Sequence, residues 1–125
     1  MLKKLTEHVY YTPPEPENDR PVLGAVVGTT RTLMIDAGNS PRHARTFLDL
    51  LDRQTERTPD LVVLTHWHGD HACGLSEVNA PAVAHRNVRA RPAALEGLSW
   101  EDEALDTRVA QGEEIAFCNE AIKKE

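Results

Sequence analysis

Four potential metal ligands lie within six residues of the segment LTHWHGDHACG. His66 and His68 are alternate residues, so in an extended segment their side chains point the same way, about 6.6 Å apart along the chain. Both can lean toward one ion, at the ~2.0–2.1 Å typical of zinc–nitrogen bonds. Asp70 and His71 follow Gly69, where the backbone can turn, and adjacent residues do not normally converge on an ion held just before them. The spacing therefore predicts two neighbouring metals, each of which needs further ligands.

The position of this loop separates a metal site from a chance cluster of surface histidines. The preceding run DLVVLT, residues 60–65, is continuously apolar, as expected of a strand buried on both faces of a sheet. Open α/β sheets place their ligands at the carboxyl ends of strands. A dense set of ligand types directly after such a strand favours the metal site.

The run HWHGDH, residues 66–71, resembles the HxHxDH signature of the metallo-β-lactamase superfamily, and the VVLT strand before it is similar as well. LMIDAG, residues 33–38, resembles the family's early strand and its Asp-Gly turn. The order of hairpin, helix, strand and loop is also that of the family. The resemblance implies an α/β fold, namely half of an αββα sandwich with a mixed β-sheet and flanking helices. Residues 1–125 would be the N-terminal part of such a domain.

The same resemblance implies a metal-dependent hydrolase with one or two zinc ions, or with iron or manganese. By position, His66 and His68 would hold the first metal. Asp70 and His71 would hold the second, and Asp70 would also act catalytically by orienting the attacking water. Asp36 would be a buried carboxylate that supports the metal loop. Zinc lowers the pKa of a bound water toward ~7 and polarises the oxygen of an ester, thioester, amide or phosphodiester.

The family completes its sites with a histidine, a bridging aspartate and another histidine from the second half of the fold. After His71 this sequence has one histidine, His85, which lies too early, and we expect it to be structural or solvent-facing. Cys73 lies close enough to approach a metal, but we favour packing beneath the loop. We expect Cys118 to be a buried thiol. Other candidates are interpreted as ordinary surface or structural residues: His8, His43, Asp102 and Asp106.

The elements that position the loop follow from local patterns. TPPEPENDRP predicts an irregular loop, and GTTR joins two β-prone runs as a hairpin in which Gly28 supplies unusual backbone angles. Ser40 and Pro41 predict the start of a helix. Its apolar face would comprise Ala44, Phe47, Leu48 and Leu51. The expected strands are residues 5–11, 22–28, 32–38, 60–65, 80–85 and 114–118, and the expected helices are residues 39–53, 87–97 and 99–109.

The totals exclude several classes of protein. A chain of 125 residues suggests one domain or part of a larger one. The formal charge of −6, with no basic cluster, argues against nucleic acid as a partner. No run approaches the ~20 apolar residues of a membrane span, and two cysteines make no disulfide framework. We therefore expect a cytoplasmic protein with a small-molecule substrate.

Two functions compete. The first is a metal-dependent hydrolase, or the half of one that carries the metal loop. The second is a non-catalytic half-domain that binds metal weakly or assembles with a partner. Half a sandwich exposes an apolar sheet face, which a homodimer or the C-terminal half of the fold would cover. A redox pair of Cys73 and Cys118 is a weaker idea, because no CxxC spacing supports it.

Overall fold

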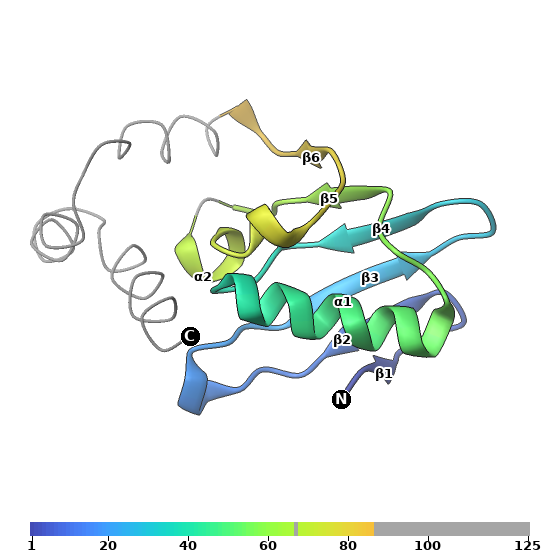
Figure 1. The fold of residues 1–125 in the computed structure, drawn as a ribbon, viewed down its shortest axis with the longest axis horizontal. Coiled ribbons are helices and arrows are strands. Elements are labelled where there is room, and N and C mark those ends of the chain that lie inside the picture. The colour runs from blue at the N-terminus through green and yellow to red at the C-terminus, as the bar shows by residue number, and fades with distance from the viewer. Residues whose placement is uncertain (67, 87–125) are drawn as a thin grey trace, which may run out of the picture.

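The computed structural model describes residues 1–66 and 68–86, which form a six-stranded sheet with the strands in chain order (Figure 1). The first four strands pair antiparallel, and β4, β5 and β6 are parallel. The strands are β1 Lys3–Lys4, β2 Val9–Thr12, β3 Leu23–Val27, β4 Thr32–Ile35, β5 Leu61–Val63 and β6 Ala82–Val83. The helices are α1 Pro41–Thr55 and α2 Gly69–Ala72, with 3-10 turns η1 Pro16–Asn18 and η2 Leu75–Glu77.

The predicted hairpin is present as β3 and β4, in which Ala25 pairs with Met34. The role expected of Gly28 was wrong, because Gly38 is the glycine with a positive φ among the described residues. Gly28 instead makes a close approach. Its amide donates to the carbonyl of Arg31 at 2.8 Å, and a Cβ at Gly28 would lie 3.0 Å from that same oxygen.

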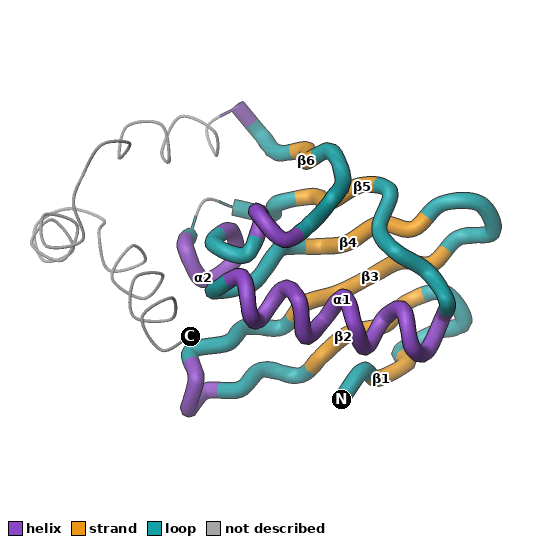
Figure 2. Tube along the Cα trace, in the orientation of Figure 1, coloured by secondary structure: helices purple, strands orange, loops and turns teal. Residues whose placement is uncertain are grey.

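Helix α1 begins where the sequence predicts. The Ser40 side chain accepts from the His43 amide at 3.1 Å, and Pro41 occupies the first turn. Figure 2 shows α1 running across the sheet, with a loop from its end returning to β5. Of the four residues expected on its apolar face, three are buried and Leu48 is partly buried. Phe47 and Leu51 form one cluster with Leu23, Ala25, Met34 and Val62 of the sheet, and Leu48 packs against it, so the core lies between α1 and the strands.

The opposite face of the sheet is apolar and less covered. We call it the open face, and it carries alternate residues of three adjacent strands: Val26, Leu33, Ile35, Leu61 and Val63. All five are partly exposed, and no helix of the described residues covers them. Strand β5 was expected to be buried on both faces. That was wrong for the described residues, because only Val62 faces α1. The architecture is half of a two-sheet sandwich.

The strands predicted at residues 5–11 and 80–85 are shorter in the structure, where β2 and β6 take their places. The helices predicted at residues 87–97 and 99–109 and the strand at 114–118 lie outside the described residues. The predictions for Asp102, Asp106 and Cys118 lie there as well. Within the described part of the chain, no helix has the length and apolarity to cross a membrane.

Candidate metal centre

The histidine loop, which we define as residues 65–74, follows β5 at the carboxyl end of the parallel strands. Asp36 follows the neighbouring strand β4, so pairing of β4 with β5 brings it beside the loop. The amide of Asp36 donates to the carbonyl of Val63 at 2.9 Å. Helix α2 and the start of α1 lie at this same end of the sheet (Figure 1). Two elements distant in sequence thus meet at one edge.

Three imidazoles converge within the loop. The ring centroids of His66 and His68 are 4.6 Å apart, and those of His66 and His71 are 4.1 Å apart. His71 returns toward the earlier histidines because one turn of helix begins at Gly69, and the amide of His71 donates to the carbonyl of His68 at 3.0 Å. The Nε2 atom of His71 also lies 3.5 Å from the Oδ2 atom of Asp70. The predicted ligands are close together, while their division between two metals stays a prediction.

Asp36 organises the loop through both of its carboxylate oxygens. Its Oδ1 atom accepts from the Thr65 amide at 2.8 Å. Its Oδ2 atom lies 2.8 Å from the Nδ1 atom of His71. The hydroxyl of Thr65 lies 2.9 Å from Oδ1 and 2.8 Å from Oδ2. The Asp36 side chain is 7% exposed, so these hydrogen bonds replace the water that burial removes.

The same contacts set the tautomers of two imidazoles. An ionised carboxylate only accepts hydrogen bonds, so His71 must donate from Nδ1 and the Thr65 hydroxyl must give its single proton to Asp36. The Nδ1 atom of His66 lies 2.7 Å from that hydroxyl oxygen and is left to donate to it. His66 and His71, when neutral, then each keep a lone pair on Nε2. A nitrogen lone pair on an oriented ring is the donor that zinc takes from histidine.

The pKa shifts of the site follow from burial and from these hydrogen bonds, and they differ between the two imidazoles. Burial alone would raise the pKa of the Asp36 carboxyl, but hydrogen bonds from His71 and Thr65 outweigh it and hold that pKa below its ordinary value. The hydrogen bond to Asp36 raises the pKa of the His71 imidazole against the effect of burial. Burial lowers the pKa of His66, and the His71 and His68 rings add to that shift. The neutral form of His66 that a metal needs is therefore favoured.

Proximity alone would also allow Asp36 to be a ligand, since its oxygen and one ring nitrogen each of His66 and His71 lie within 4.8 Å of one another. We assign Asp36 a supporting role, because Thr65 and His71 already engage both of its oxygens. The donors present, imidazoles and a carboxylate, suit zinc. The support role and the ligand set both stay predictions.

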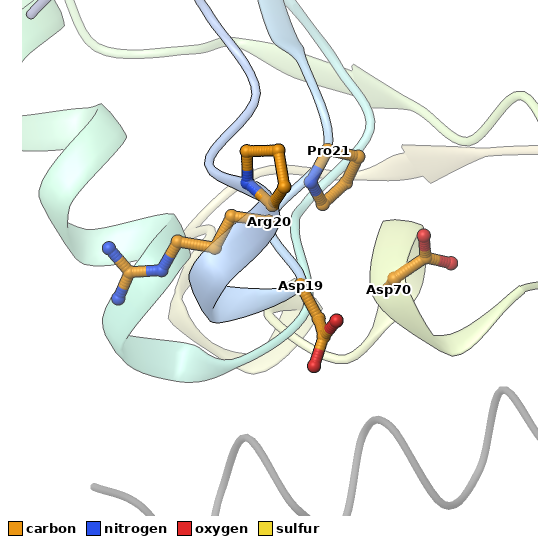
Figure 3. Close-up of a pocket in the computed structure, with 5 residues that line it drawn as sticks. Asp19, Arg20, Pro21 and Asp70 are labelled. Atoms are coloured by element: carbon orange, nitrogen blue, oxygen red, sulfur yellow. The ribbon is translucent and has the colours of Figure 1, made fainter.

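A cavity of about 370 Å³ adjoins the histidine loop. It is lined by Pro16, Asp19, Arg20, Pro21 and Asp70 (Figure 3). One wall is the turn after β2, and the other is the start of α2. Figure 3 shows Asp19 and Asp70 on facing elements, with the guanidinium of Arg20 directed away from Asp70. The cavity therefore lies on the side of the histidine loop that carries Asp70.

The role of Thr65 and the burial of His43 were not predicted from the sequence. Nothing in the sequence marks Thr65, because its role depends on a carboxylate 29 residues away. His43 was interpreted as ordinary, but it is 5% exposed and its Nδ1 atom accepts from the amide of Asn39 at 3.2 Å. Its place three residues after the capping Ser40 was the available signal. His85 is exposed as expected, and Cys73 is partly buried at the end of α2.

His43 should make the fold sensitive to acid. Burial lowers the pKa of His43 from 6.5 to about 4, and the Arg20 guanidinium adds to the shift. Below about pH 6.5 the unfolded chain binds a proton that the folded chain refuses until about pH 4. The free energy of unfolding should therefore fall by about 3 kcal/mol between pH 7 and pH 4 on this account alone.

Urea unfolding at several pH values measures this effect. The His43→Gln chain keeps a hydrogen-bond acceptor and should show a flatter pH profile than the wild type. The His8→Gln chain, changed at an exposed histidine, is the matched control. Equal pH dependence in all three chains would contradict the assignment.

Comparison with known proteins agrees with the fold. The family model for the metallo-beta-lactamase superfamily matches residues 20–115. A metallo-beta-lactamase from Pontibacter korlensis is 20% identical with a TM-score of 0.60, and the match covers 79% of this chain and 49% of that one. One from Erythrobacter litoralis is 19% identical with a TM-score of 0.58, covering 78% and 46%. The Rm3 metallo-beta-lactamase is 24% identical with a TM-score of 0.55, covering 65% and 30%.

At these identities the solved structures establish the fold alone. The chain spans about half the length of the first of them. No curated protein matches the sequence.

Proposed function

Because the chain belongs to the metallo-beta-lactamase superfamily, we propose that it is a metal-dependent hydrolase, or the part of one that carries the metal loop. The observation that carries this proposal is the hydrogen-bond chain from Asp36 through Thr65 and His71, which orients converging imidazoles. A buried carboxylate that fixes the tautomer of a histidine is the usual support of a metal ligand. The substrate class is an ester, thioester, amide or phosphodiester of a small molecule.

Zinc fits the donors of the loop, and iron and manganese are the alternatives. His66 and His68 would hold one ion, and Asp70 and His71 a second. A zinc ion lowers the pKa of a bound water toward ~7 and polarises the substrate oxygen. Asp36 would not bond to the metal. Through its hydrogen bonds to Thr65 and His71 it would keep the rings of His66 and His71 in the orientation and tautomer that metal binding needs.

Asp70 is placed to serve the reaction as well as the metal. Asp70 is one of the residues that line the cavity of about 370 Å³, so it lies beside the space that a substrate would enter. A carboxylate there accepts a hydrogen bond from the attacking water and thereby fixes its direction. Of the described ligand candidates, Asp70 is the one that lines this cavity, and we therefore assign it the catalytic role.

The remaining ligands are proposed to come from outside the described residues. The chain covers 49% and 46% of two solved relatives. The open face of the sheet is apolar and partly exposed. A second half of the fold, or a second copy of the chain, would bury this face and is the proposed source of further donors. Either partner would complete the sandwich.

A non-catalytic role is the second candidate. Apart from Asp36, the donors brought together among the described residues come from a single loop. Such a set could hold one ion loosely without supporting turnover. A half-domain of this kind would bind metal weakly or assemble with a partner through the open face.

Zinc content and turnover separate the two candidates. The zinc-loaded chain is expected to retain one or two ions on gel filtration and to hydrolyse 4-nitrophenyl acetate or bis(4-nitrophenyl) phosphate. Chelation should abolish the activity, and added zinc should restore it. His68→Ala should lower both zinc content and rate at least about tenfold, while His85→Ala, at an exposed position, should change neither. Loss of zinc with no turnover would favour the half-domain, and equal effects of the two variants would contradict the ligand assignment.

A further inference from the structure

One wall of the cavity beside the histidine loop is a turn that lies outside the β-sheet. This wall is the turn at residues 15–20, which contains η1 and lies between β2 and β3. Its two ends are joined by hydrogen bonds from the Glu15 amide to the Arg20 carbonyl at 2.9 Å and from the Arg20 amide to the Glu15 carbonyl at 3.1 Å. An ion pair between the same two side chains at 3.6 Å and a hydrogen bond from the Asn18 side chain to Glu15 add to this closure. Asp19 at its tip has a left-handed φ of 52°. Exposed turns are more mobile than the strands they connect, so a hydrogen bond from a buried residue outside the turn would restrict its position. We call such a contact a tether.

Asn39 supplies that tether. Its side-chain Nδ2 atom donates to the carbonyl of Asn18 at 2.8 Å and to the carbonyl of Asp19 at 3.0 Å, so both amide protons are used on the turn. The residue is 1% exposed. Its backbone amide donates to the Nδ1 atom of the buried His43, which fixes Asn39 from the other side. The Asn39 end of the contact is therefore buried and fixed, while the two carbonyls that it binds belong to an exposed turn.

The segment that carries Asn39 also holds the opposite wall. Asp36, three residues earlier, binds the histidine loop through Thr65 and His71. The amide of Ala37 donates to the carbonyl of His71 at 2.8 Å. The amide of Gly74 donates to the carbonyl of Gly38 at 3.1 Å. One short stretch after β4, residues 36–39, therefore binds both the histidine loop, which carries Asp70, and the turn, which carries Asp19.

We propose that Asn39 is a positioning residue that sets the width of the substrate cavity by fixing the turn at residues 15–20 against the histidine loop. The inference rests on the proposed hydrolase function for its substrate, although the tether itself is independent of any metal. Asn39 does not line the cavity. It acts through Asn18 and Asp19, whose backbone it holds. Its removal should widen the cavity and leave the metal ligands in place.

The kinetic test compares Asn39→Ala with Asn18→Ala. Asn18 gives Asn39 its backbone carbonyl, while its own side chain donates to the Glu15 carboxylate within the turn at 3.1 Å. Asn18→Ala therefore keeps the tether, removes one side-chain hydrogen bond of the turn itself, and serves as the matched control. In the zinc-loaded chain, Asn39→Ala is expected to raise KM for 4-nitrophenyl acetate by about three- to tenfold with kcat changed less than about twofold. Zinc content should be unchanged, and Asn18→Ala should behave as the wild type. A fall in zinc content or in kcat at constant KM would overturn the proposal.

A second measurement needs no turnover. Hydrogen exchange of the Glu15 and Arg20 amides should be at least about fivefold faster in Asn39→Ala than in the wild type. The Gly28 amide, bonded to Arg31 in the β3–β4 hairpin, is the internal reference and should not change. Unchanged exchange in the turn would overturn the tether. If the wild type proves inactive, the hydrolase proposal fails, and faster exchange confined to the turn still supports the role of Asn39.

The wild-type chain provides a check that does not depend on how the variant folds. Its Glu15 and Arg20 amides should be protected from exchange, because each donates to the carbonyl of the other residue and Asn39 holds the backbone between them. If these two amides were unprotected in the wild type, Asn39 would not be fixing the turn and the proposal would be wrong.

Discussion

Replacing Asp36 with asparagine is expected to weaken zinc binding by about 10- to 100-fold while the chain stays folded. The carboxylate accepts from the Thr65 amide, from the Thr65 hydroxyl and from His71. An asparagine side chain of the same size offers one acceptor oxygen and an NH₂ group that faces donors. The tautomers of His66 and His71 would then no longer be fixed. The loss should appear as a lower affinity without the removal of any ligand.

A competition titration with a chromogenic zinc chelator measures this affinity. Asp60→Asn is the matched control, because the Oδ2 atom of Asp60 also accepts from a backbone amide, that of Thr32 at 2.7 Å, but at the amino end of β5, opposite to the end that carries the histidine loop. Its zinc affinity should equal that of the wild type. If both variants lost affinity equally, general destabilisation and not loop orientation would be the cause.

Gly74→Ala is expected to destabilise the fold by at least about 3 kcal/mol. A Cβ at this position would lie 2.1 Å from the carbonyl oxygen of Ala37, 2.6 Å from that of Ser40 and 2.8 Å from the Cβ of Ala44. None of these atoms is the end of a flexible side chain, so the backbone must shift. The shift would separate the histidine loop from the segment that follows β4, and zinc binding should fall together with stability.

Urea unfolding monitored by circular dichroism tests this prediction. Gly24→Ala is the control, since a Cβ there meets its nearest atoms at 3.7 Å, an ordinary contact. We expect a small effect at Gly24 and a large one at Gly74. Similar unfolding midpoints for Gly74→Ala and the wild type would show that the loop does not pack against Ala37 and Ser40 as described.

The parts of the fold that local patterns control were predictable from the sequence. Ser40 and Pro41 predict the start of α1, and the spacing of Ala44, Phe47 and Leu51 predicts its buried face. The hairpin of β3 and β4 follows from two β-prone runs with a short turn between them. These signals act over a few residues, so one sequence is enough to detect them.

Features that depend on distant partners were not predictable in the same way. Apolarity of the run at residues 60–65 indicated burial on both faces, yet Leu61 and Val63 lie on the open face. Asn39 and His43 are hydrogen-bonded to each other and buried, and the Asn39 side chain binds the turn at residues 15–20. Nothing in the local sequence around Asn39 indicates that its side chain binds two carbonyls about 20 residues earlier.

The candidate site falls between these cases. The spacing of the loop predicted two adjacent ligand pairs, His66 with His68 and Asp70 with His71. The ring centroids of His68 and His71 lie 4.6 Å and 4.1 Å from that of His66, and the division into two pairs stays a prediction. The family resemblance singled out Asp36 as their support. Thr65, which links Asp36 to His66, became visible only from the geometry.

The most direct test of the proposed metal centre is a crystal structure grown with zinc, with anomalous differences measured at the zinc absorption edge. The account predicts an anomalous peak bonded to His66 and His68, with any second ion on Asp70 and His71, and Asp36 still hydrogen-bonded to Thr65 and His71. An absent peak at the histidine loop, or imidazoles turned apart with Asp36 itself on the ion, would contradict it.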